Sequence, residues 1–475
     1  MAVLRGLCLT IALLTLSLVP ANAQQTDTPP ENIFGIVEGM WFPEMTCDLN
    51  PGWERIIFDW GAHQPQSAED WVPFLNIPDE WLKAANDCNR EIVAVVKNTP
   101  AWATDGIPGA GVPRGLYLPI DDPDNVWASF MRRTADYYAS RGVKRFIIWN
   151  EPDIAAGTYG FEFEGSLEDY FTLVKVAYLA AKDGNPAATI HLAGTTYWHD
   201  VNSGDRLYTD RLLERIASDP DGAEHDYYFD ALSLHIYFRT DTVYDIVGVY
   251  RDLLDQHGFE DKAVWITETN ASPNLDPDWP VTRPQFQITL QQQAAYVIQA
   301  AALGLAADAE RIAVYKLYDQ SLPPGGESFG LLVPRTGPEE PLIPRPAFSA
   351  WQTVIANFNG VDAAHLHQNE RVNVVELQHT NDRQTLVAWS RFEHSTQVEI
   401  AATSDKAYLL DYMGNQTMIR PTDGLYTLML RGANCEDDEG CVVGGMPVML
   451  VQPHGELTVT EITPENRYTL TALAE

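Results

Sequence analysis

The sequence predicts an α/β protein, a (β/α)8 TIM barrel followed by a small C-terminal β-sandwich domain. Through about residue 320, short apolar runs alternate with segments of helical spacing, and this alternation occurs eight times. Beyond about Val361, short β-type runs separated by turn residues replace the alternation. Eight strand–helix repeats are typical of a closed parallel barrel, whereas a series of short strands is typical of a sandwich.

The expected barrel strands are continuous apolar runs, which indicates burial on both faces and hence a parallel sheet. They are residues 33–37, 55–60, 92–97, 146–149, 189–193, 231–236, 264–267 and 312–317. The clearest helix between them begins with Ser166 and Asp169 in a capping-box pattern and ends at 184–186. A doubly wound open sheet is the alternative, but no GxGxxG motif opens the chain.

The C-terminal third begins after a Pro- and Gly-rich loop and a helix, residues 347–358, that we expect to close the barrel. The expected sandwich strands are 372–377, 385–389, 397–401, 407–412 and 448–451. We therefore predict a barrel of residues 31–358 and a sandwich of residues 361–475.

The N-terminus has the three parts of a secretory signal peptide. Arg5 supplies a positive charge, residues 7–19 are apolar, and Ala21-Asn22-Ala23 fits the cleavage site. We predict a signal peptide over 1–23 and a flexible leader over 24–30, with an uncleaved anchor as the alternative. No later stretch is long and apolar enough to span a bilayer, so we expect a secreted or extracytoplasmic protein with no membrane insertion after cleavage.

The formal net charge of −35 limits the partners of the protein. A field this negative repels nucleic acid and anionic lipid, so we expect no nucleic-acid binding. It also disfavours a polyanionic substrate unless the binding pocket is itself basic.

Four cysteines remain once the predicted signal peptide is removed. Export makes disulfides possible, and Cys435 and Cys441 flank a polar loop that a short bridge could close. Cys47 and Cys88 would then pair by elimination. Metal binding is the competing interpretation, but no CxxC motif occurs and no histidine has a suitable spacing.

Two of the expected strands end at a glutamate, namely Glu151 and Glu268. Catalytic groups of such barrels lie at the carboxyl ends of the strands, so the two carboxylates should face one pocket. Paired carboxylates of this kind are what cleavage of a glycosidic bond requires. Other aromatic and polar residues at strand ends suit a sugar site, although each could instead be a packing residue: Trp60, Asn98, Trp102, Asn150, His235, Tyr237 and Tyr318.

Two signatures give the chain a family resemblance. Trp149-Asn150-Glu151-Pro152 and Ile266-Thr267-Glu268 resemble the strand-four and strand-seven motifs of clan A glycoside hydrolases, with family 39 and its relatives most similar. Residues 99–103 and 345–347 are also similar to that group.

The resemblance implies a role for each matching residue. Glu151 would be the general acid/base and Glu268 the nucleophile, while Asn150 would hydrogen-bond the sugar 2-hydroxyl. Tyr237 would donate a hydrogen bond to Glu268, and His235 would line the same rim.

The sequence departs from the clan in two places. Arg55 falls at the start of its expected strand, so we expect it not to be the rim arginine of other members. The eighth strand lacks the usual rim tryptophan and has Tyr315 or Tyr318 nearby.

The function predicted from these residues is that of a secreted retaining glycoside hydrolase. It would cleave O-glycosidic bonds of a poly- or oligosaccharide by a two-glutamate double displacement, without cofactor or metal. The alternative is a non-catalytic barrel that binds glycan, with a carbohydrate-binding sandwich. A metal-dependent hydrolase is a third class, but the chain has no HExxH motif, and its one HxH, at 365–367, follows the closing helix.

Overall fold

The computed structural model describes residues 32–282, 284, 286–323, 325–435, 441–463 and 466–473. The predicted signal peptide and leader, residues 1–30, lie outside the described residues. Contacts group residues 31–475 into one compact unit, in which one helix ends at Phe358 and a new strand begins at Val361. The division into two domains at this point stays a prediction.

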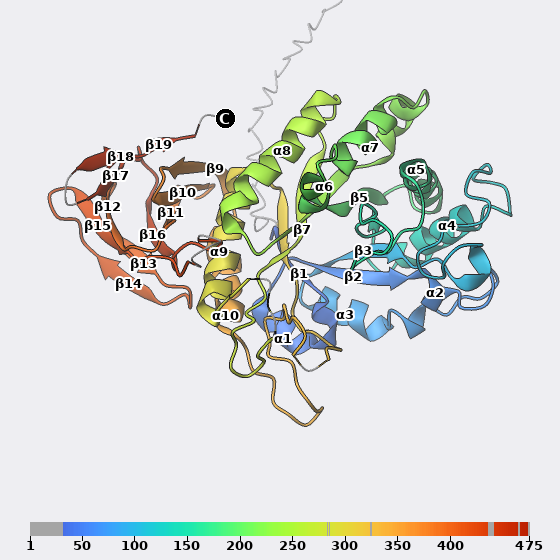
Figure 1. Ribbon diagram of the computed structural model, residues 1–475, viewed down its shortest axis with the longest axis horizontal. Helices are drawn as coiled ribbons and strands as arrows, with labels where there is room; N and C mark the ends of the chain where they lie inside the picture. The colour runs from blue at the N-terminus through green and yellow to red at the C-terminus, as the bar shows by residue number, and fades with distance from the viewer. Residues whose placement is uncertain are drawn as a thin grey trace, which may run out of the picture. The chain divides into compact units, whose positions relative to one another are not determined.

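The predicted barrel is confirmed (Figure 1): eight parallel strands pair in sequence order, and the first closes onto the eighth. The strands are β1 (Phe34–Val37), β2 (Trp53–Asp59), β3 (Glu91–Lys97), β4 (Arg145–Ile148), β5 (Thr189–Thr196), β6 (Ala231–Tyr237), β7 (Ala263–Asn270) and β8 (Arg311–Val314). All eight lie where apolar runs were found, but β2 begins two residues earlier than predicted and β7 ends three residues later.

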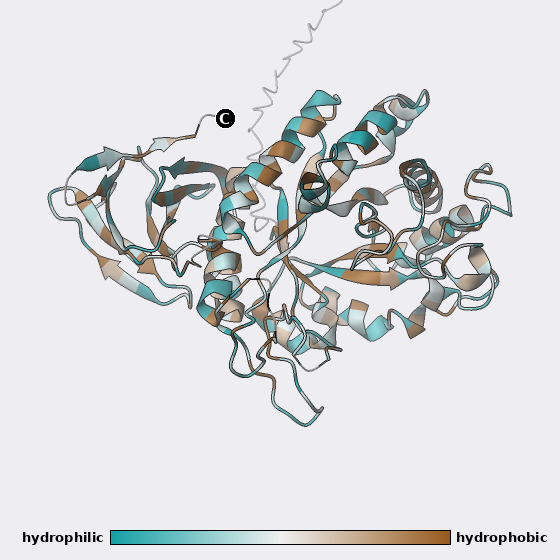
Figure 2. Cartoon of the chain, viewed as in Figure 1, coloured by the Kyte–Doolittle hydropathy of each residue, from teal (hydrophilic) through white to brown (hydrophobic). Residues whose placement is uncertain are grey.

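The helices around the barrel cover its strands. They are α1 (Pro43–Leu49), α2 (Trp60–His63), α3 (Asp79–Asp87), α4 (Val126–Ala139), α5 (Leu167–Gly184), α6 (Tyr197–Ser203), α7 (Tyr208–Ala217), α8 (Val243–Gln256), α9 (Leu290–Ala306) and α10 (Pro346–Phe358). The predicted capping box is present, because the Ser166 side chain accepts from the Asp169 amide and the Asp169 carboxylate accepts from the Ser166 amide. Apolar and polar stretches alternate along α8, as expected for a helix with one face on the barrel (Figure 2).

Among the described residues, no helix combines the length and apolar character that crossing a bilayer requires.

The C-terminal part consists of two antiparallel sheets, as a sandwich requires. One sheet has seven strands in the order β14-β13-β16-β11-β10-β9-β19, and the other has four in the order β15-β12-β17-β18. The strands are β9 (Val361–Gln368), β10 (Val372–His379), β11 (Arg383–Ser390), β12 (Thr396–Ala401), β13 (Ala407–Leu410), β14 (Gln416–Ile419), β15 (Leu425–Leu430), β16 (Val448–Pro453), β17 (Val459–Ile462), β18 (Arg467–Thr469) and β19 (Thr471–Ala472). The five predicted runs are β10 to β13 and β16. The His365-Leu366-His367 motif lies in β9, where His367 is 3.3 Å from Glu376 on β10.

Both expected disulfides are present. Cys47 in α1 is joined to Cys88, which follows α3, and Cys435 is joined to Cys441. The first bridge closes a segment of the barrel that includes β2, and the second lies beside a contact between the sandwich and the barrel.

That contact centres on Gln299, a buried residue of α9. Its Oε1 accepts hydrogen bonds from Thr240 Oγ1 (2.7 Å) and the Gly444 amide (3.1 Å), and its Nε2 donates to the Gly445 carbonyl (2.8 Å). The Thr240 amide in turn donates to the Val442 carbonyl. Because Thr240 follows β6 by three residues, the segment after Cys441 supports the loop at the carboxyl end of that strand.

Candidate active site

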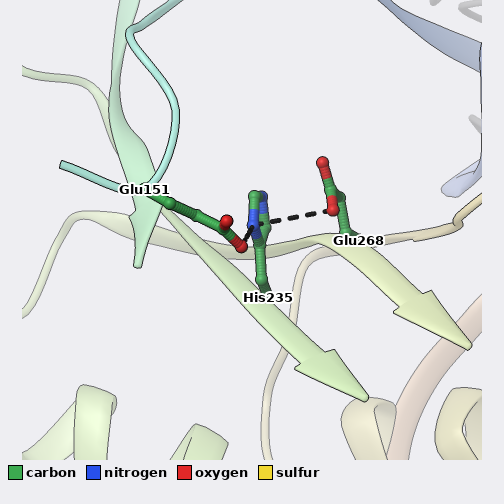
Figure 3. A group of neighbouring side chains, drawn as sticks. All are labelled: Glu151, His235 and Glu268. Atoms are coloured by element: carbon green, nitrogen blue, oxygen red, sulfur yellow. Dashed lines mark hydrogen bonds and ion pairs between the residues drawn. The ribbon is translucent and has the colours of Figure 1, made fainter. Parts of the chain in front are cut away.

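Glu151 and Glu268 lie together at the carboxyl end of the barrel (Figure 3). Both line one cavity of about 670 Å³. One carboxylate oxygen of each glutamate and one ring nitrogen of His235 all lie within 4.8 Å of one another. The chain turns sharply after β4, where Trp149 and Glu151 have φ of 74° and 40°. Positive φ is uncommon outside glycine, and such strain is concentrated at functional sites.

His235 lies between the two glutamates. Its Nδ1 is 2.7 Å from Glu151 Oε1 and 3.6 Å from Glu268 Oε2. The imidazole fits only because residue 194 is glycine, since a Cβ there would lie 2.1 Å from His235 Nε2. The Gly194 carbonyl also accepts the backbone amide of Glu151 at 3.0 Å. One glycine on β5 therefore leaves room for the histidine and fixes the chain that carries Glu151.

Glu268 is held in its ionised form. Arg55 Nη1 donates to its Oε1 at 2.5 Å, and the Tyr237 hydroxyl donates to its Oε2. Burial alone raises the pKa of the Glu268 carboxyl, but His235, Arg55 and the Tyr237 hydrogen bond outweigh burial and leave the pKa below its usual value. Burial and the Glu268 charge raise the pKa of Tyr237 well above its usual value, so its hydroxyl stays a donor.

The prediction that Arg55 lies away from the rim is wrong. Arg55 is the third residue of β2, and its Nη2 also donates to Asn150 Oδ1 at 2.6 Å. The stagger of the barrel strands explains the error, because Arg55 pairs in register with Val37, the last residue of β1. A residue early in one strand is thus level with the end of its neighbour, and its long side chain reaches the cavity.

Asn150 is fixed on both sides of its amide group. Its Oδ1 accepts from Arg55, and its Nδ2 donates to Glu162 Oε2 at 3.0 Å. Glu162 lies in the loop between β4 and α5 and pairs with Lys97 at 2.6 Å. The sequence did not single out Glu162, because no periodicity or motif marks a residue in an irregular loop.

The rest of the cavity wall comes mainly from the segments after β4 and β8. Lys316 Nζ pairs with Glu38 at 2.6 Å, and Tyr315 packs edge-on against Tyr237 with ring centroids 5.8 Å apart. Of the two tyrosines considered at the eighth strand, Tyr315 lines the cavity. Tyr318 is buried against Phe42, and its hydroxyl accepts from the Arg335 amide.

Three further predicted residues are placed outside the cavity. Trp60 is fully buried and stacks on Phe130, with ring centroids 4.9 Å apart. Trp102 packs edge-on against Trp60 and donates to the Gln64 carbonyl, and Asn98 donates to Asp59. These three residues and Tyr318 are not among the described residues that line the cavity. The structure thus brings Glu151, Glu268, Asn150, Tyr237 and His235 together, whereas the other four are not among the described residues that line this cavity.

Glu151, His235 and Glu268 are also arranged closely enough to hold a metal ion. The donors around them disfavour this use. Both oxygens of Glu268 already accept hydrogen bonds, one of them from the Arg55 guanidinium, and a cation there would be repelled by Arg55. The arrangement suits proton transfer and nucleophilic attack better than metal ligation.

Replacing Arg55 by Gln should move the acid limb of the kcat/KM–pH profile to higher pH. Loss of the guanidinium removes one of the charges that lower the Glu268 pKa, so the carboxylate would be protonated at a higher pH than in the wild type. Lys97→Gln is the matched control, because Lys97 pairs with Glu162 and not with Glu268. An acid limb that stays in place in the Arg55 variant would contradict this account of Glu268.

Comparisons with known proteins define the fold class. No protein-family model matches the chain, and no curated protein sequence matches it. Solved structures do match. A family 39 glycoside hydrolase from Bacteroides cellulosilyticus WH2 has a TM-score of 0.64 at 16% identity, over 89% of this chain and 81% of that one. The catalytic domain of the GH30 xylanase C of Talaromyces cellulolyticus has a TM-score of 0.57 at 13% identity, over 90% and 97% of the two chains.

A monomeric β-xylosidase from Caulobacter crescentus CB15 is similar to the same degree, with a TM-score of 0.57, 13% identity, and coverage of 90% and 97%. At these identities the likeness concerns the fold. The protein therefore has the barrel-and-sandwich fold found in glycoside hydrolases of families 39 and 30. What it does must be argued from its own site.

Proposed function

We propose that the protein is a retaining glycoside hydrolase that cleaves O-glycosidic bonds of a poly- or oligosaccharide. The observation that carries the proposal is the closeness of Glu151 and Glu268 in one cavity, with carboxylate oxygens within 4.8 Å. Retaining enzymes have carboxyl groups about 5–5.5 Å apart, whereas inverting enzymes need about 6.5–9.5 Å to admit a water. The spacing supports direct attack by one carboxylate.

The environments of the two glutamates support different roles. Glu268 is ionised, nearly buried and oriented by Arg55 and Tyr237, as a nucleophile must be. Glu151 is the more open of the two, with 18% of its side chain exposed against 8% for Glu268, and its carboxyl is hydrogen-bonded to His235. We assign Glu151 the proton transfers, because exposure lets it meet the leaving group and then water.

In the first step, a Glu268 oxygen bonds to the anomeric carbon while the bond to the leaving oxygen breaks, and Glu151 gives its proton to that oxygen. In the second step, Glu151 takes a proton from water, whose oxygen displaces Glu268 from the anomeric carbon. Both glutamates return to their starting states, and no cofactor is consumed. Arg55 donates to both Glu268 and Asn150, and this shared contact supports our assignment of the Asn150 amide to binding of the sugar 2-hydroxyl.

A glycan-binding barrel without activity is the second candidate function. It requires a sugar-sized cavity but places no demand on the charge state of Glu268, so the Arg55 and Tyr237 contacts favour the hydrolase. Hydrolysis of a panel of aryl glycosides and neutral polysaccharides tests the choice. Turnover of at least one substrate supports the hydrolase, and saturable binding of glycans with no turnover across the panel supports the binding protein.

Chelation should leave the activity unchanged. Two carboxylates suffice for the proposed chemistry, and Arg55 makes the Glu151–His235–Glu268 group a poor cation site. The measurement is the initial rate before and after exhaustive treatment with a chelator and dialysis. A loss of activity that one specific divalent cation restores, with the fold unchanged by circular dichroism, would favour the metal-dependent class instead.

We further propose that the protein acts outside the cytoplasm. The signal-peptide pattern of residues 1–23 and the two disulfides are compatible with export, since disulfides persist in oxidising compartments. N-terminal sequencing of the protein from culture medium would show whether the mature chain begins at Gln24.

A further inference from the structure

A second cavity, of about 360 Å³, adjoins the one that holds both glutamates. The two share Glu151, Tyr237 and Phe238. The remaining lining residues of the second cavity are Thr196, Tyr197, Trp198, Asn202, His235, Arg239 and Phe286. Glu268, Arg55 and Asn150 are not among the described residues that line it.

Because Glu151 lines both cavities, each cavity can be matched to one part of the substrate. The sugar that is attacked must lie against the nucleophile, and Glu268 lines only the first cavity. The leaving oxygen must meet the acid, and Glu151 lines both cavities. The group that departs therefore extends from Glu151 into the second cavity.

The wall of the second cavity suits a sugar. Five of its described lining residues are tyrosine, tryptophan or phenylalanine, and Asn202 and Thr196 offer polar groups beside them. Rings that stack on the apolar face of a pyranose, with a few polar groups for its hydroxyls, are typical of carbohydrate sites. Arg239, the one arginine among the described lining residues, is paired with Asp241 at 2.8 Å and lies over the Trp198 ring, 5.9 Å from its centroid, so its charge is partly compensated. The wall favours a neutral sugar over a uronate.

Trp198 is the largest aromatic side chain among the described residues that line the second cavity. It lies in α6, directly after β5, with its ring half-buried and packed edge-on against Tyr197 at a centroid distance of 5.1 Å. Two other lining residues pack on each other, because the Phe238 and Phe286 ring centroids are 5.2 Å apart, and the Phe238 amide donates to the Asn270 carbonyl.

The hollow continues beyond Trp198. A depression of about 380 Å³ shares Thr196, Trp198 and Asn202 with the second cavity and extends to Ile154, Thr158 and Tyr159, of which Tyr159 also lines the first cavity. A single small leaving group would not use this extension, whereas a chain of sugars would pass along it.

We propose that the second cavity is the leaving-group subsite, that Trp198 is its stacking residue, and that it takes a neutral sugar of an oligo- or polysaccharide. The proposal rests on the proposed hydrolase function. It makes Trp198 a determinant of substrate choice that takes no part in the proton transfers or the nucleophilic attack.

The test compares two substrates that share the attacked sugar. One is a neutral oligosaccharide cleaved by the wild type, and the other is the glycosyl fluoride of the same sugar, whose leaving group is too small to use the subsite. Trp198→Ala should lower kcat/KM for the oligosaccharide on the order of tenfold, because a stacking contact is lost, and should leave the fluoride rate unchanged. Trp81→Ala is the matched control, since Trp81 is also half-buried but packs on Trp41 outside both cavities.

Each outcome separates this inference from the proposed function. Wild-type protein that cleaves no oligosaccharide and no glycosyl fluoride across the panel from which the two substrates are chosen refutes the hydrolase itself. Wild-type activity on both, with Trp198→Ala unchanged or equally impaired on both, overturns the subsite while leaving the hydrolase in place. If Trp198→Ala does not fold, Trp198→Phe takes its place. A partial loss on the oligosaccharide alone then supports the subsite, and no loss overturns it.

Discussion

Replacing Glu268 by Gln should lower kcat by roughly 10⁴-fold or more. The amide cannot attack the anomeric carbon, and among the described residues that line the cavity no other carboxylate has the same contacts with Arg55 and Tyr237. The amide is close in shape to the carboxylate and its oxygen can still accept a hydrogen bond, so we expect the fold to persist. The measurement is the steady-state rate on the best aryl glycoside, with circular dichroism and a melting curve on the same sample.

Glu54→Gln provides the matched control for that variant. Glu54 precedes Arg55 on β2 and forms a buried ion pair with Arg90 at 2.6 Å, outside the cavity. Both substitutions remove one charge from a buried pair and should destabilise the fold in a similar way. Only Glu268→Gln should abolish turnover. A Glu268 variant that is folded and keeps more than a few per cent of wild-type activity would exclude Glu268 as the nucleophile.

Replacing Glu151 by Ala should give a loss that depends on the leaving group. For substrates that need protonation of the leaving oxygen, kcat/KM should fall by about 10²–10⁴-fold, the usual contribution of general acid catalysis. For substrates such as dinitrophenyl glycosides, the first step should still occur, so that a glycosyl-enzyme accumulates on Glu268.

Added azide should restore turnover of the Glu151→Ala variant. The small anion can occupy the space left by the side chain and attack the glycosyl-enzyme without a general base. The expected product is a glycosyl azide with the configuration of the substrate, identified by NMR. A uniform loss across leaving groups, with no response to azide, would show that Glu151 does not transfer the proton.

The fold could be predicted from the sequence because its signals are local. Buried parallel strands leave continuous apolar runs, and all eight barrel strands were found this way. The sandwich was predicted less completely. The strands that were missed include β14 and β18, whose residues are mostly exposed and carry little hydrophobic signal. The strand boundaries shifted by one to three residues in several cases, and this shift affected the interpretation of Arg55.

The site could be predicted only where a residue sits in a motif or at a strand end. Glu151, Asn150, His235, Tyr237 and Glu268 meet that condition, and the structure brings them together. Trp60 and Trp102 meet it as well, but their rings turn into an aromatic cluster, which the sequence does not distinguish from a sugar platform.

The residues that were missed reach the site through three-dimensional geometry. Arg55 depends on the stagger between β1 and β2, and Glu162 lies in an irregular loop. The second cavity combines α6, the loop after β6 and Phe286. No spacing rule relates segments so far apart in the chain.

The configuration of the first-formed product tests the central claim most directly. Proton NMR of a hydrolysis reaction, recorded before mutarotation is appreciable, distinguishes the two anomers of the released sugar. One carboxylate oxygen of Glu151 lies within 4.8 Å of one of Glu268, a separation that favours the retaining geometry over the wider inverting one, so Glu268 should attack the anomeric carbon and the product should keep the configuration of the substrate. A first-formed product of inverted configuration would contradict the nucleophilic role of Glu268 and the two-step mechanism with it.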